Sequence, residues 1–135
     1  MQGRFFNSIV LRRRIFWGWT ILIVLLTSMP SNPDILHQKK DAIIRLDYLE
    51  HIFFFVVLTI LYYMAYLTIA GQITRIKLIY WLAGGIVFAS ITEIYQIIIP
   101  GRAYNPVDLV LNLAGLVIGI PLGKWITGRI NWSGG

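Results

Sequence analysis

Long apolar segments alternate with short charged stretches along this chain. Four such segments run over about residues 15–29, 47–70, 78–99 and 107–125. A transmembrane helix needs about 20 predominantly apolar residues, and repeated runs of this kind are typical of an integral membrane protein. We therefore expect an all-α fold: a polytopic membrane protein with four transmembrane helices, in a single membrane domain over residues 1–135.

The amino-acid composition supports a membrane protein and excludes several chemistries. Hydrophobic residues make up 57% of the chain and charged residues only 13%, against roughly 25% in globular proteins. The absence of cysteine excludes disulfides, thiolate metal sites and cysteine nucleophiles. The net charge of +6 is concentrated at the ends of apolar segments, which is typical of topology signals. We expect the lipid bilayer as a partner and no nucleic acid.

The basic residues predict the orientation in the membrane. With the N-terminus inside, eight basic residues are cytoplasmic and four are external, which obeys the positive-inside rule. Both termini are then cytoplasmic, and we expect a multi-pass protein of the plasma membrane. The eight are Arg4, Arg12, Arg13, Arg14, Arg75, Lys77, Lys124 and Arg129, and the four are Lys39, Lys40, Arg45 and Arg102.

The first apolar segment, residues 15–29, is short for a span and follows a basic stretch, as a secretory signal does. Residues 27–30 (Thr-Ser-Met-Pro) do not form a small-x-small cleavage site, and further spans follow. We interpret the segment as an uncleaved first helix that ends at Pro30. The stretch over residues 1–14 is interpreted as a basic tail, with a short interfacial helix as the alternative.

Seven polar residues lie near the external ends of the other three predicted helices. A charge at mid-helix costs about 2.5–3.5 kcal/mol on insertion scales, so such groups normally face protein or water and mark a site. Within each helix they are three or four residues apart and therefore share one face. We expect them to line an outer-leaflet pocket. The seven are Asp47, His51, Glu93, Gln96, Arg102, Asp108 and Asn112.

Glu93 and His51 are the candidate catalytic residues, as the general base and its partner in a carboxylate-based hydrolase. The other five residues of the set are candidate binding residues. Among them, Arg102 is the expected contact for an anionic phosphate or carboxylate. A metal site of His51, Asp47 and Glu93 is a minority alternative, because no repeated ligand motif accompanies it. We expect no metal and no cofactor.

Each of these residues also has a structural interpretation. Asp47 and Asp108 stand where N-terminal helix caps are found. Arg102 can be a solvated loop charge beside lipid headgroups. His51 can form a hydrogen bond that ties two helices together, and the two amide side chains of the set can do the same.

Four motifs in this order resemble those of the VanZ-like family, small membrane proteins named for an accessory determinant of teicoplanin resistance. Residues 27–30 resemble the family's small-Ser-x-Pro ending of the first helix, and residues 47–53 its Asp-Lys-x-x-His-Phe motif. Residues 93–102 resemble Glu-x-x-Gln followed by Pro-Gly-Arg, and residues 108–115 resemble Asp-x-x-x-Asn-x-x-Gly. Tyr48 replaces the usual lysine. The resemblance implies four membrane helices, a role in the cell envelope, and lowered glycopeptide susceptibility in some members.

Two functional hypotheses follow. In the first, the outer pocket binds or chemically modifies a cell-wall or lipid-linked envelope molecule. In the second, the protein is a non-catalytic membrane partner subunit whose polar cluster only holds its own helices together. Gly115, Gly119 and Gly123 lie on one helix face, and this stripe of small residues would then be the surface for an oligomer or a partner.

Overall fold

The computed structural model describes residues 9–30, 46–67 and 75–129. Within these ranges the chain is all-helical, with four helical segments and no strand, so the all-α expectation is confirmed there. The segments are α2 (Ile9–Thr27); α4 (Leu46–Tyr62), continued by the π-helical turn η2 (Tyr63–Leu67); α5 (Arg75–Tyr95), continued by the 3₁₀ turn η4 (Gln96–Ile98); and α6 (Pro106–Arg129).

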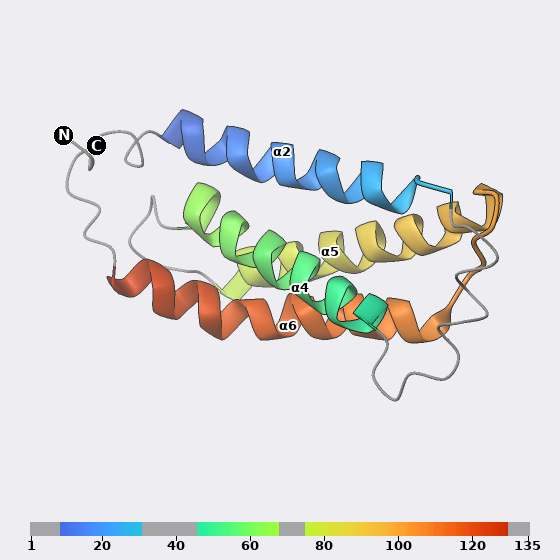
Figure 1. Ribbon diagram of the computed structural model, residues 1–135. Helices are drawn as coiled ribbons and strands as arrows, with labels where there is room; N and C mark the ends of the chain where they lie inside the picture. Colours follow the sequence, from blue (N-terminus) through green and yellow to red (C-terminus); the bar gives the residue numbers. More distant parts are fainter. Residues whose placement is uncertain (1–8, 31–45, 68–74, 130–135) are drawn as a thin grey trace.

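The helices run alternately in opposite directions along one bundle (Figure 1). α2 and α5 end where α4 and α6 begin. This end is called the polar end, because it holds His51, Glu93, Arg102, Asp108 and Asn112. At the opposite end, called the basic end, α2 and α5 begin and α6 finishes. The described cations of the basic end are Arg12, Arg13, Arg14, Arg75, Lys77, Lys124 and Arg129.

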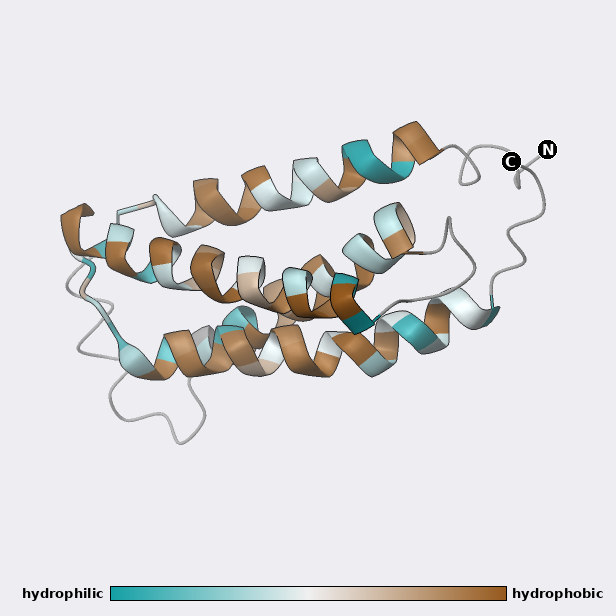
Figure 2. Cartoon of the chain, turned by 180° about the vertical axis from the view of Figure 1, so that it is seen from behind, coloured by the Kyte–Doolittle hydropathy of each residue, from teal (hydrophilic) through white to brown (hydrophobic). Residues whose placement is uncertain are grey.

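Three helical stretches of the described chain are long and apolar enough to cross a membrane: Tyr48–Leu67, Arg75–Ile98 and Pro106–Arg129. Their mean hydropathies are 1.6, 1.5 and 1.8. Hydrophobic residues predominate along the bundle, with the hydrophilic ones gathered toward its ends (Figure 2). α2 is 19 residues long but contains three arginines near its start, which lowers its apolar character relative to the other three.

The start of α2 corrects one expectation. The helix begins at Ile9, so Arg12, Arg13 and Arg14 lie inside it and not in a tail that precedes it. Arginine is a good helix former, and its long side chain can reach the membrane interface from within a helix. Arg12 is only 8% exposed, and its Nη1 donates a hydrogen bond to the carbonyl oxygen of Met64 in η2 at 3.0 Å.

The other helix bounds differ from the expected ones by a few residues. α5 begins at Arg75 and α6 continues to Arg129, because hydropathy falls at basic residues before the helical backbone ends. Regular α-helix in α5 stops at Tyr95, and a 3₁₀ turn completes the segment to Ile98. Residues 68–70, which we expected in the second span, lie outside the described ranges.

The glycine stripe of α6 packs against α4 and η2. An added Cβ at Gly115 would lie 2.6 Å from the Ile52 carbonyl oxygen, and one at Gly119 would lie 2.5 Å from Thr59 Cβ. At Gly123 the added atom would meet the Tyr63 ring at 2.9 Å. The small residues thus let α4 and α6 approach closely. The stripe is therefore used for packing within the chain, and an oligomer or membrane partner stays a prediction.

Candidate functional site

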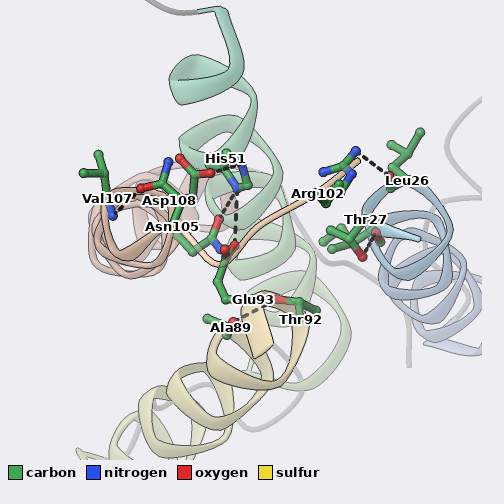
Figure 3. Close-up of polar contacts among 12 residues, drawn as sticks. Leu26, Thr27, His51, Ala89, Thr92, Glu93, Arg102, Asn105, Val107 and Asp108 are labelled. Carbon is green, nitrogen blue, oxygen red and sulfur yellow. Dashed lines mark hydrogen bonds and ion pairs between the residues drawn. The ribbon is translucent and has the colours of Figure 1, made fainter. Parts of the chain in front are cut away.

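His51 is the residue on which the polar side chains of three helices converge (Figure 3). It lies in the second turn of α4, with 15% of its side chain exposed. Its Nδ1 is 2.9 Å from Asn112 Oδ1 on α6, and Asn112 Nδ2 donates to Glu93 Oε1 on α5 at 2.9 Å. The three side chains form one hydrogen-bonded chain from α5 through α6 to α4.

The proton of His51 can be placed from this chain. A carboxylate oxygen accepts hydrogen bonds, so the NH₂ group of Asn112 faces Glu93. The amide oxygen of Asn112 therefore faces His51, and His51 Nδ1–H donates to it. This arrangement leaves His51 Nε2, 3.6 Å from Asp108 Oδ2, as the nitrogen that can take up a further proton.

Glu93 is the most deeply buried acid of the described chain, at 0% exposure. Its Oε1 accepts from Asn112 and lies 3.8 Å from His51 Nδ1. Its Oε2 has no hydrogen-bond partner among the described residues. Buried charged groups in proteins are normally paired or hydrogen-bonded, so the half-satisfied carboxylate of Glu93 is an unusual feature of this bundle.

Asp108 does not cap α6, although its position suggested a cap. Asn105 takes that role, because its Oδ1 accepts the backbone N–H of Val107 at 3.1 Å. Asp108 lies in the first turn, where an acid suits the helix dipole, and its Oδ2 faces His51. Its Oδ1 is buried without a partner in the described chain. The side chain therefore belongs to the polar cluster.

Arg102 closes the end of α2. Its Nε donates to the Met29 carbonyl oxygen at 2.9 Å, and its Nη2 donates to that of Leu26 at 3.3 Å. The last carbonyl groups of a helix lack partners within the helix, and a basic side chain can satisfy them. Arg102 is half-buried, which corrects its interpretation as a solvated loop charge.

Gln96 lies near the cluster without a hydrogen bond to it in the described ranges. Gln96 is 3% exposed in η4, and its Nε2 has no hydrogen-bond partner in the described ranges. It is thus buried near the polar end without a recorded bond to His51 or Glu93. The backbone of Asp47 belongs to α4, but its side chain lies outside what the structure describes.

A small pocket opens beside His51, between α2, α4 and the start of α6. It has a volume of about 60 Å³ and is partly open. Leu26 and Arg102 line it, so the contact that closes α2 also forms part of the pocket wall. The remaining lining residues are Ile23, Thr27, Glu50, His51, Phe54, Phe55 and Asn112.

Sequence reasoning missed part of this wall. Glu50 is not among the seven candidate residues, and none of the seven comes from α2. The signal that was present is the position of Glu50 next to His51 at the start of an apolar helix. No sequence signal identified Ile23 and Leu26, because they are ordinary apolar residues of an apolar helix.

Among the described side chains, no group of three or more His, Asp or Glu residues is arranged to hold a metal ion. Asp47, the third ligand of the alternative metal site, is not among them. Hydrogen bonding and the transfer of a proton at His51 are the chemistry that this cluster supports directly.

The model of the VanZ/LLP1 family matches residues 16–127. The chain belongs to the VanZ/LLP1 family. The match includes all seven candidate residues and runs from α2 into the last turns of α6. No curated protein and no solved structure matches the chain. For this VanZ/LLP1 protein, the arrangement of the polar end is therefore the main guide to function.

Proposed function

We propose that this VanZ/LLP1 protein is a single four-span domain of the plasma membrane, with both termini cytoplasmic and the polar end outside. The assignment of α2 as a membrane span needs an argument of its own. Its 19 residues extend over roughly 28 Å at 1.5 Å per residue, close to the hydrocarbon thickness of about 30 Å. Its three arginines lie at the basic end, where they reach the interface. Seven of the eight described Lys and Arg residues lie at the basic end, which supports the orientation.

The pocket at the polar end binds a cell-wall or lipid-linked envelope molecule, or modifies one chemically. The observation that carries this proposal is the chain Glu93–Asn112–His51, which leads from a fully buried carboxylate to the wall of a pocket. A group that only held helices together would not need to end at a pocket. In this arrangement Glu93 and Asn112 orient the ring, and His51 meets the ligand.

The roles of the other residues follow from their positions. If a bond is broken, His51 and Glu93 are the acid–base pair, and Asp108 beside Nε2 stabilises a protonated ring. Arg102 lines the pocket and has N–H groups left for an anionic part of the ligand. Asp47 and Gln96 remain candidate binding residues.

The expected phenotype is lowered susceptibility to the glycopeptide teicoplanin. The test is teicoplanin susceptibility of a Gram-positive host that expresses wild type, Glu93→Gln or His51→Ala at matched membrane levels. We expect wild type to protect and both variants to lose protection while they remain folded. As a matched control, Gly84→Ala changes a position with nothing within 4 Å and should protect like wild type.

A second candidate function rests on the same hydrogen bonds. Two hydrogen bonds of 2.9 Å that join three helices are also expected of a cluster that only holds the helices together. In that case the protein is a non-catalytic partner subunit, and Glu93→Gln lowers its stability without any further effect. Equal protection by folded wild type and folded variants would favour this second function over the first.

A further inference from the structure

The pocket presents an acid and a base that are not paired with each other. Glu50 and Arg102 both line it. The ion pairs at the polar end join His51 to Glu93 and to Asp108, and within the described ranges none joins Glu50 to Arg102. A guanidinium has five N–H donors, and Arg102 uses its Nε and Nη2 groups on α2. Both charges therefore remain available to a ligand that carries the two opposite signs.

The polar end as a whole favours a hydrogen-bond donor. Two acceptor atoms, Glu93 Oε2 and Asp108 Oδ1, are buried without a partner in the described chain, against one donor there, Gln96 Nε2. Among the described side chains of the polar end, three acids, counting Glu50, stand against one arginine. A purely anionic ligand would meet this excess of negative charge at close range, whereas an ammonium group would be attracted by it.

Part of the pocket wall is apolar, beside the polar side chains of Thr27, His51 and Asn112. Ile23 and Leu26 of α2 line it together with Phe54 and Phe55 of α4. An apolar surface of this kind suits contact with a hydrocarbon chain, because removal of apolar surface from water is favourable. The pocket thus combines a negative group, a positive group and an apolar side.

We propose that the pocket binds the zwitterionic headgroup of an aminophospholipid. Glu50 receives the ammonium group and Arg102 receives the phosphate. The acyl chains lie outside the pocket, against the half-buried Leu26 and Phe54, because a volume of about 60 Å³ is too small to enclose them. This inference rests on the proposed function and names the ligand class of the same pocket. His51, which also lines the pocket, lies next to Glu50 in sequence and faces the headgroup.

The test measures lipid binding to the purified full-length protein in dodecyl maltoside by native mass spectrometry. The probes are the dioleoyl forms of phosphatidylethanolamine, phosphatidylcholine and phosphatidylglycerol at equal concentration. We expect ethanolamine lipid to bind at least fivefold more tightly than glycerol lipid, with choline lipid between them, because choline keeps the charge but has no N–H donor. Equal binding of the three, or preference for glycerol lipid, would overturn the proposal.

Two variants test which pocket residue binds the ammonium group and which binds the phosphate. Glu50→Gln should remove the preference for ethanolamine lipid, whereas Arg102→Gln should weaken all three lipids alike, because all three carry the phosphate. Lys77→Gln, at the basic end, is the control and should change nothing. Glu50 is exposed, so its variant should unfold at the wild-type temperature without lipid. A Glu50→Gln protein that keeps the full preference would contradict the assignment.

Two further measurements distinguish a failure of this inference from a failure of the proposed function. Glycerophosphoethanolamine, the headgroup without acyl chains, should bind much more weakly than the lipid. If it binds equally well, the ligand is a soluble phosphoethanolamine and the lipid proposal is wrong. Teicoplanin protection that depends on Glu93 together with no lipid preference would leave the proposed function intact and refute only this inference.

Discussion

Asn112 is the residue on which the polar cluster depends. It is 1% exposed, and it is the side chain that connects Glu93 with His51. An amide suits this place because it offers a donor to the carboxylate and an acceptor to the ring at the same time. Aspartate would place a second acceptor against Glu93, and leucine would supply neither group.

Asn112→Leu should therefore destabilise the protein. The change leaves Glu93 Oε1 and His51 Nδ1 without their partner, and buried unsatisfied groups cost about 1–3 kcal/mol. Thermal unfolding in detergent measures the loss. Val110→Leu, at a position 62% exposed on the same helix, is the control and should unfold like wild type. If the two variants unfold at the same temperature, the hydrogen-bonded chain contributes nothing to stability.

At the residue scale, the polar positions could be found from the sequence but their partners could not. Glu93 and His51 stand out because the residues around them are apolar. Which face of one helix meets which face of another depends on crossing and rotation, and these are set by packing across the whole interface. The partners of Arg102 are backbone carbonyl groups, which every residue has, so no sequence pattern marks them.

At the element scale, the pair α4 and α6 forms the tightly packed part of the bundle. The glycine stripe brings the two backbones close, and this contact holds His51 on α4 opposite Asn112 on α6. α2 is attached differently. Its basic end contacts η2 through Arg12 and an aromatic cluster that includes Phe16 and Tyr66, and its far end is held by Arg102. The spacing of the glycines predicted close packing, but not that the partner helix is α4.

Gly119→Ala should separate α4 from α6. The new Cβ would lie 2.5 Å from Thr59 Cβ and 2.9 Å from the Val56 carbonyl oxygen, so a helix backbone must move. Overpacking of this kind costs about 1–3 kcal/mol, which a lowered unfolding temperature in detergent would show. Gly84→Ala is the matched control, because nothing lies within 4 Å of its added atom. Equal unfolding temperatures for the two variants would contradict the packing of α6 on α4.

At the scale of the whole molecule, the described helices form a bundle with seven of the eight described Lys and Arg residues at one end and the described acids at the other. The number of long apolar segments could be predicted from the sequence, because apolar surface of this extent has to be covered by lipid or protein. The start of α2 could not, because arginine is compatible with both a helix and a tail. Whether α2 crosses the membrane is the question on which the topology depends.

Cysteine labelling in intact cells tests whether α2 crosses the membrane. The chain has no cysteine of its own, so each introduced cysteine is labelled alone. A membrane-impermeant maleimide should label Met29→Cys and Tyr104→Cys, which are 58% and 44% exposed near the polar end. Arg13→Cys and Lys124→Cys, at the basic end, should react only after the cells are permeabilised. If Tyr104→Cys reacts and Met29→Cys does not, α2 lies on the cytoplasmic side and the chain has three spans.

The central claim is that Glu93 and Asn112 orient His51 so that its Nδ1 carries the proton and its Nε2 is left for chemistry. Nitrogen-15 NMR of the histidine ring, with the protein in bilayers, tests it directly. The chain has two histidines, so His37→Gln leaves the signal of His51 alone. We predict a protonated Nδ1 in wild type, and a changed Nδ1 resonance in Asn112→Leu. An unprotonated Nδ1 in wild type would mean that Asn112 does not link His51 to Glu93, and the proposed site would then lose its basis.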